Sequence, residues 1–229
     1  MYTLYIANKN YSSWSLRPWL LLRELGIPFE EKLVRFTSDL NWETFRMFSP
    51  SGQVPTLHDG RTVVWDSLAI TEYFAERHKG VWPEDATARA WARCAAAEMH
   101  SGFTVLRTRC SNSCGVRVEL REIPSELQRD IGRINELWNE GLDRFGGPFL
   151  AGPKFTAVDA FYAPVIFRFQ TYGLIAERSA TAYMARILAL PSMSSWYADA
   201  LKEPWREAAH DAHIATYATV IEDLRATKI

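Results

Sequence analysis

Short apolar runs and helical periodicities alternate over the first third of the chain. Residues 2–7 form an apolar, β-rich run that predicts a strand, and residues 29–36 repeat that pattern. Between them, the pattern of residues 16–25 is helical and stops at Gly26, with Pro28 just beyond. A glycine after the last turn followed by a proline is typical of a helix end. The chain therefore opens with a strand, a helix and a second strand.

A hairpin and a helix are expected after an irregular stretch. Residues 54–58 and 62–65 are two apolar runs that enclose Asp59-Gly60, and Asp-Gly between such runs favours a tight β-turn. Residues 68–78 then have a helical pattern. The order β-α-β followed by β-β-α predicts an α/β domain with a mixed sheet over residues 1–79.

Helical periodicity dominates the rest of the chain. Residues 79–86 combine glycine, proline and charge without a period, which is typical of a linker. Beyond them, apolar residues at three- and four-residue spacing mark one helix face: Trp91, Ala95, Met99, Phe103, Leu106 and Cys110. Further helices are predicted over residues 125–145 and from near Thr156, near Arg178 and after Pro191. The fold class is therefore α+β, with an all-α domain over residues 87–229.

Composition narrows the class of function. The net charge is -1, so the basic excess of a nucleic-acid-binding protein is missing. No apolar run approaches the roughly 18 residues of a membrane span, and the first residues lack the layout of a signal peptide. The three cysteines are an odd number, which does not suit a disulfide framework, and Cys110 and Cys114 have no histidine at ligand spacing. We expect a cytoplasmic protein without a metal, a nucleic-acid partner or a membrane contact.

Three serines stand between the first strand and the first helix, at Ser12, Ser13 and Ser15. Pro18 suits the first turn of a helix, so we expect the helix to begin near Ser15 with one serine as its N-cap. Capping alone does not need three serines. A hydroxyl just ahead of a helix N-terminus can also donate to an anion, because the helix dipole and free N–H groups favour negative charge there.

Three further motifs each allow a structural and a functional interpretation. In Gln53-Val54-Pro55-Thr56-Leu57, a cis proline would leave the main chain of Val54 free to pair with an extended peptide, whereas a trans proline would be an ordinary edge feature. Asp66-Ser67 can cap the following helix, or Ser67 can hold the carboxylate and Asp66 the ammonium of an amino acid. Thr156-x-x-Asp159 is a capping box, for which the structural interpretation is favoured.

The combination of these motifs is more specific than any one of them. Their order along the chain resembles that of the soluble glutathione S-transferases, in particular serine-type members such as the zeta class. The resemblance covers essentially the whole chain. It implies a thioredoxin-like first domain that binds glutathione, a helical second domain that contributes the electrophile site, and a homodimer.

By position, the resemblance also implies which residues bind glutathione. Ser12 matches the serine that faces the sulfur, and Ser13 is the alternative. Val54, before the family's cis-proline Pro55, matches the residue whose main chain pairs with the cysteinyl part.

The resemblance assigns clear residues to the γ-glutamyl end of glutathione but not to its glycyl end. Asp66 and Ser67 match the pair that holds the γ-glutamyl end. No basic residue is evident for the glycyl carboxylate, and Arg35 and Gln53 are the candidates.

The apolar co-substrate is expected between the domains, against Trp14, Phe103 and Arg107. Trp14 is near the sulfur by sequence, and Arg107 could bind an anionic substrate or balance developing charge, although its helix face could also be simply solvated. Trp14 stands where the zeta class often has cysteine, which argues against zeta-type isomerase activity.

Serine fits the chemistry of this family. A thiol with a pKa near 8.5 is only a few per cent ionised at neutral pH, and the thiolate is the nucleophile. A hydrogen bond to a charged acceptor contributes about 1.5–3 kcal/mol, or roughly one to two pKa units. The sequence therefore predicts a glutathione transferase active in detoxification. A glutathione-dependent isomerase or lyase, or a non-catalytic binding protein of this fold, is the alternative. A disulfide reductase would need cysteine where the serines stand.

Overall fold

The computed structural model describes residues 1–37 and 41–225. The first domain is a four-stranded sheet in the order β2-β1-β3-β4 with three helices. Its elements are β1 (Tyr2–Ile6), α1 (Ser13–Glu24), β2 (Phe29–Leu33), α2 (Asn41–Arg46), β3 (Thr56–Asp59), β4 (Thr62–Trp65) and α3 (Ser67–Ala75). β1 pairs with β2 in parallel and with β3 antiparallel, and β3 and β4 form the expected hairpin. The thioredoxin-like prediction for this domain is confirmed.

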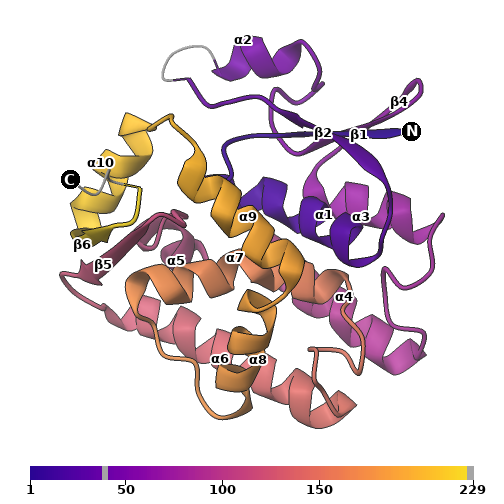
Figure 1. Ribbon diagram of the computed structural model, residues 1–229. Helices are drawn as coiled ribbons and strands as arrows, with labels where there is room; N and C mark the ends of the chain where they lie inside the picture. Colours follow the sequence, from indigo (N-terminus) through magenta and orange to yellow (C-terminus); the bar gives the residue numbers. More distant parts are fainter. Residues whose placement is uncertain (38–40, 226–229) are drawn as a thin grey trace.

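Helices lie on both sides of this sheet. α1 and α3 lie on the side that faces the second domain, and α2 lies on the other side (Figure 1). The short helix α2 falls in the segment that the sequence pattern left irregular. It buries Phe45 alone, so no helical period of apolar residues marks it.

The start of α1 differs from the prediction. Ser12 is the N-cap, with its side chain accepting a hydrogen bond from the Ser15 N–H, and the helix begins at Ser13 rather than near Ser15. Pro18 therefore lies inside the helix and not in its first turn. The prediction relied on the proline, which removes a donor but does not by itself fix which serine caps the helix.

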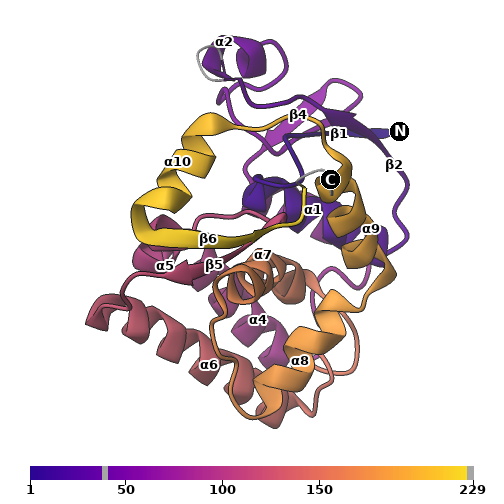
Figure 2. The same cartoon turned by 60° about the vertical axis from the view of Figure 1, so that its left-hand side comes forward.

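The second domain is mainly helical, as predicted, but it is not all-helical. Its helices are α4 (Ala86–Ser101), α5 (Thr104–Arg109), α6 (Ser125–Phe145), α7 (Ala157–Tyr172), α8 (Ser179–Leu188), α9 (Pro191–Lys202) and α10 (Ala208–Tyr217). An antiparallel pair of strands, β5 (Val116–Leu120) and β6 (Ala218–Asp223), lies among them. Figure 2 shows this pair beside α10. The all-α prediction failed because each strand is short and its partner is distant in the sequence.

α7 is the centre of the second domain. Nearly all of its side chains are buried, and it packs between the other helices (Figures 1 and 2). The predicted capping box is confirmed: the Thr156 side chain and the Asp159 side chain each cap the other's main chain. Asp159 also accepts from the Leu150 N–H at 3.0 Å and from the Tyr183 hydroxyl at 3.2 Å. This network fixes the start of the helix that carries Arg168 to the cleft between the domains.

The cysteines and the lengths of the apolar helices can be described directly. All three cysteines are free, and burial raises the pKa of both Cys110 and Cys114 to about 12. Within residues 1–37 and 41–225, no helix is both long and apolar enough to cross a membrane.

Two glycines of α6 provide a test of the packing. A Cβ on Gly141 would lie 2.4 Å from Cη2 of Trp91 and 2.5 Å from the Leu150 carbonyl oxygen, whereas a Cβ on Gly132 would meet nothing within 4 Å. Gly132→Ala should therefore raise the free energy of unfolding by about 0.5–1 kcal/mol through helix propensity. Gly141→Ala should lower it by roughly 1–3 kcal/mol through overpacking. Urea unfolding of both variants checks this, and equal stabilisation by both would contradict the packing described.

Candidate functional site

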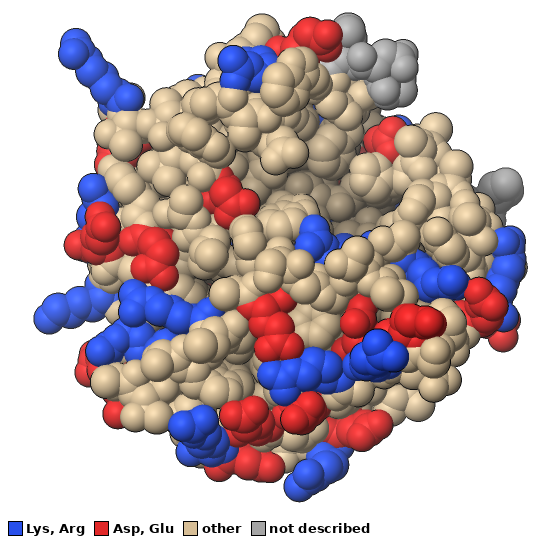
Figure 3. All heavy atoms as spheres, turned by 180° about the vertical axis from the view of Figure 1, so that it is seen from behind, with Lys and Arg blue, Asp and Glu red and all other residues tan. Residues whose placement is uncertain are grey.

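A cleft of about 820 Å³ opens between the two domains. The surface is hollowed there on the face opposite to that of Figure 1 (Figure 3). The first domain lines it with residues before α1 and around β3 and α3, and the second domain with residues of α5, α7 and α10. Both domains thus contribute to one site.

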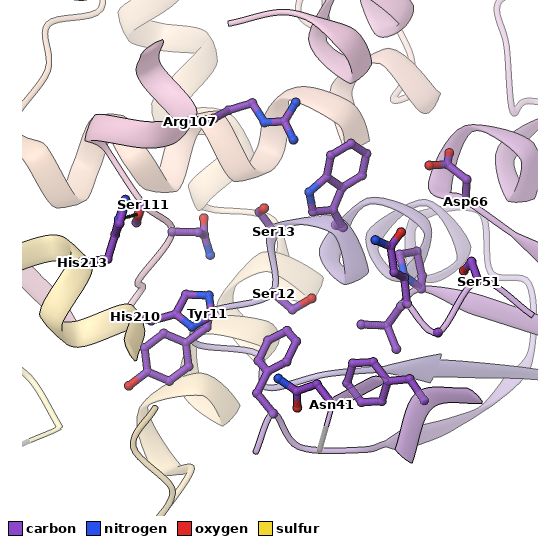
Figure 4. A pocket seen from close by; sticks show the side chains of 18 of the residues that line it. Tyr11, Ser12, Ser13, Asn41, Ser51, Asp66, Arg107, Ser111, His210 and His213 are labelled. Atoms are coloured by element: carbon purple, nitrogen blue, oxygen red, sulfur yellow. Dashed lines mark hydrogen bonds between the residues drawn. The ribbon is translucent and has the colours of Figure 1, made fainter. Parts of the chain in front are cut away.

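Ser12 and Ser13 both reach the cleft. The Ser12 hydroxyl donates to Oγ of Ser15 at 2.7 Å, and no hydrogen bond joins the Ser13 side chain to any described residue. In Figure 4, the Ser12 oxygen points towards the side that carries Ser51 and Asp66, whereas the Ser13 oxygen points towards Arg107. The two hydroxyls therefore face different halves of the cleft.

The strand start before β3 forms the wall beside Ser12. Gln53, Val54 and Pro55 line the cleft, and the Val54-Pro55 peptide bond is cis. The Thr56 hydroxyl donates to the Gln53 carbonyl oxygen at 2.9 Å and so fixes this turn. Within the described part of the chain, no hydrogen bond engages the main chain of Val54. The edge is open to an extended peptide. Arg35 does not line the cleft.

Asp66 and Ser67 have different environments. Asp66 lines the cleft, has a φ of 65°, and accepts from the Leu68 N–H at 2.7 Å as the N-cap of α3. Its other carboxylate oxygen lies 3.7 Å from Nε2 of His100. Ser67 is fully buried and its hydroxyl accepts from Arg17 at 3.5 Å. The prediction that the Ser67 hydroxyl binds a ligand is corrected, because the first turn of α3 directs it at α1.

Two guanidiniums and an imidazole lie against Trp14. Arg17 lies 4.1 Å and Arg107 4.8 Å from the centre of its ring, and His100 contacts it edge-on at 5.2 Å. Burial, followed by the charges of Arg107 and Arg168, lowers the pKa of Arg17 to about 9. Trp14 and Arg107 both line the cleft, and their contact with the co-substrate stays a prediction.

Phe103 is a correction. It does not line the cleft but a separate surface groove with Arg129 and Asp130. The predicted continuous helix breaks at Gly102-Phe103, where Phe103 has a φ of 53°, so α4 and α5 point in different directions. The helical spacing that placed Phe103 beside Arg107 does not hold across this break.

The far wall of the cleft was missed in the sequence. It consists of Ser111, Asn112, Arg168, His210 and His213. Oγ of Ser111 lies 2.6 Å from Nδ1 of His213, as the dashed line in Figure 4 marks. One signal was available: Arg168 interrupts an otherwise apolar run. The remaining residues come from segments with no motif.

Two family models together match most of this chain. Residues 11–77 match the N-terminal domain of glutathione S-transferases, and residues 84–199 match the C-terminal domain. The chain belongs to the glutathione S-transferase family.

Individual relatives of this glutathione S-transferase are distant. A glutathione S-transferase-like protein, OpS6, of Beauveria bassiana is 26% identical over 70% of this chain and 76% of its own length. A stringent starvation protein A homolog of Pasteurella multocida is 25% identical over 73% and 77%. Among solved structures, a glutathione transferase homolog from Burkholderia gl BGR1 with bound glutathione has a TM-score of 0.67 at 23% identity, over 88% of this chain and 99% of that one. That likeness shows the shared fold.

Proposed function

We propose that this member of the family binds glutathione and ionises its thiol with the Ser12 hydroxyl for attack on an electrophile. One observation carries the proposal. Ser12 caps α1, and its hydroxyl faces the half of the cleft that holds the open edge of Val54 and the Asp66 carboxylate. A peptide paired to that edge would bring its sulfur to the start of α1, where charge on sulfur is favoured.

The rest of the half-cleft suits glutathione. An extended peptide can add to the Val54 edge through main-chain hydrogen bonds. The Asp66 carboxylate is the counter-charge for the γ-glutamyl ammonium, and Gln53 is an amide donor for the glycyl carboxylate. The Burkholderia homolog, which shares the fold, has bound glutathione, and this supports glutathione as the ligand.

The serine acts as a hydrogen-bond donor and forms no covalent intermediate. The hydroxyl rotates from Ser15 towards the thiolate while its oxygen still caps the helix, because a serine hydroxyl both donates and accepts. Oγ of Ser15 keeps the Ala7 N–H at 3.2 Å as a partner. The thiolate then forms a carbon–sulfur bond with the electrophile, and the leaving group departs with its electron pair or the adduct takes a proton from water.

A non-catalytic role is the second candidate. One fold can host unrelated functions, and the chain is also similar over most of its length to a protein whose name is not that of a transferase, a stringent starvation protein A homolog. A glutathione-dependent isomerase or lyase would use the same thiolate. Calorimetric titration with glutathione, followed by assays with a panel of electrophiles, separates these cases. Absence of glutathione binding would refute the enzyme proposal. The homodimer and the cytoplasmic location remain predictions.

Asp66 provides a direct test of the glutathione pose. Asp66→Asn keeps an oxygen for the Leu68 N–H but removes the charge, so the dissociation constant of glutathione should rise about 10–100-fold, the equivalent of one charge-assisted hydrogen bond. Asp85→Asn is the matched control, because Asp85 caps α4 through the Ala88 N–H outside the cleft. If the two variants bind glutathione equally well, Asp66 does not hold the ammonium.

A further inference from the structure

Charge is distributed unevenly along the cleft. Among the described residues that line it, Asp66 is the one carboxylate, and it stands at the end proposed for glutathione. The other end carries Arg107 from α5 and Arg168 from α7, with His210 and His213 beside them. Basic atoms are visible at the lower edge of the hollow in Figure 3. His210 is paired with the carboxylate of Glu207, so the positive charge of the half that would receive the electrophile is that of Arg107 and Arg168.

Arg168 is a buried cation that no carboxylate of residues 1–37 and 41–225 pairs with. Its residue is 7% exposed, and its Nη1 donates to Oδ1 of Asn112 at 3.3 Å. Its Nε is buried and has no hydrogen-bond partner among the described residues. Burial lowers its pKa to about 10, and no carboxylate acts against this effect. A buried, unpaired guanidinium is costly unless an anion arrives to pair with it.

Arg107 is the second cation of this wall. It stacks on Trp14, and one of its five N–H donors reaches the His100 carbonyl oxygen at 3.4 Å. Burial lowers its pKa, and it lowers the pKa of Arg168 in turn. An anion between the two guanidiniums would stabilise the charged form of both.

We propose that this wall is an anion site and that the electrophile of this enzyme carries a carboxylate, which Arg107 and Arg168 bind. This rests on the proposed function for the identity of the reaction, but not for the existence of the site. Planar guanidiniums match carboxylates through paired N–H donors, and such charge-assisted bonds are about twice as strong as neutral ones.

The arrangement also orients the electrophile. The Ser13 hydroxyl points towards Arg107 and the Ser12 hydroxyl towards the glutathione half (Figure 4). The carboxylate on the arginines therefore places the reactive carbon between them and the sulfur. Phe36 and Phe45, which also line the cleft, provide the apolar surface for the remainder of the molecule. The predicted co-substrate is an apolar electrophile with one anionic end.

An unreactive pair of probes tests the site without turnover. Calorimetry would measure the dissociation constants of 3-phenylpropanoate and of 3-phenylpropanamide, which have similar size but differ in charge. Each is titrated into wild type with and without glutathione. We expect the carboxylate to bind about 10–100-fold more tightly than the amide. Arg168→Met and Arg107→Met should each lower the ratio of the two dissociation constants at least roughly tenfold. Arg129→Met is the control, because Arg129 lies on the exposed surface of α6 outside the cleft, and it should keep the ratio of wild type.

Every outcome bears on the proposal. Equal binding of the two probes by wild type, binding of neither, or a preference that survives in the arginine variants would overturn it. Arg107 is only partly buried, so Arg107→Met answers the question even if Arg168→Met does not fold. A carboxylate preference in a protein that fails to bind glutathione would leave the anion site standing and refute the proposed function alone.

Discussion

Replacement of Asp159 by alanine is expected to cost about 3–5 kcal/mol of unfolding free energy. The carboxylate is fully buried and accepts from the main-chain N–H of Leu150 and of Thr156, at 3.0 and 2.9 Å, and from the Tyr183 hydroxyl. Each buried donor left without an acceptor costs about 1–3 kcal/mol. A domain is stable by only about 5–15 kcal/mol, so urea unfolding should show a large loss.

Asp85→Ala is the control for this prediction. Asp85 caps α4 from the exposed surface, where water replaces the lost acceptor, and its removal should cost about 1 kcal/mol. If Asp159→Ala costs no more than Asp85→Ala, the buried network does not stabilise the second domain in the way described.

The Asp159 carboxyl also makes stability depend on pH. Burial raises its pKa to about 6, against the opposing effect of the main-chain donors. Because the folded pKa lies above the ordinary value of about 3.9, the folded state binds a proton that the unfolded state releases. This contribution is full at low pH and is lost as the pH rises through about 6. Relative to Asp159→Asn, which does not titrate, wild type should therefore lose stability between about pH 4 and pH 6.

Ser12→Ala is expected to lower kcat/KM for conjugation about 10–100-fold near neutral pH. The lost hydrogen bond to the thiolate is worth about 1.5–3 kcal/mol, and kcat/KM falls by the part of it that the sulfur still holds in the transition state. The deficit should shrink as the pH rises above about 8.5, where the thiol ionises without help. Steady-state rates across pH, with any electrophile that wild type conjugates, measure this directly.

Three variants separate this role from capping. Ser12→Thr keeps both the hydroxyl and the cap and should retain most activity. Ser12→Gly keeps much of the cap without the hydroxyl, so it should lose activity with little loss of stability. Ser13→Ala should stay within roughly threefold of wild type. A large loss in Ser13→Ala with none in Ser12→Ala would transfer the role to Ser13.

Local signals in the sequence predicted most of the fold and several of the residues that line the cleft. The Asp59-Gly60 hairpin and the capping box at Thr156 depend on neighbours a few residues away, and each lies where the pattern indicated. A serine caps α1 as expected, but it is Ser12, and the helix begins at Ser13. The cis Val54-Pro55 bond was one of two alternatives that the residues alone left open. Turns and helix caps that depend on neighbouring residues could be predicted without the structure.

The remainder depends on contacts distant in the sequence. β5 finds its partner β6 about a hundred residues later, so neither short strand carries a recognisable signal alone. A single backbone break at Phe103 removed that side chain from the cleft, and the tertiary position of α1 decided that Ser67 points at Arg17. Arg168 could be noticed as a charge in an apolar helix, but its place in the cleft follows only from the packing of α7.

The central claim is that Ser12 favours ionisation of the bound glutathione thiol. The most direct test is a pH titration of the ultraviolet absorbance of the bound thiolate. In wild type the midpoint should lie roughly one to two pH units below the value near 8.5 of the free thiol. In Ser12→Ala, which should still bind glutathione, the midpoint should return towards the free value. The same low midpoint in wild type and Ser12→Ala would contradict the account, because Ser12 would then have no effect on the pKa of the bound thiol.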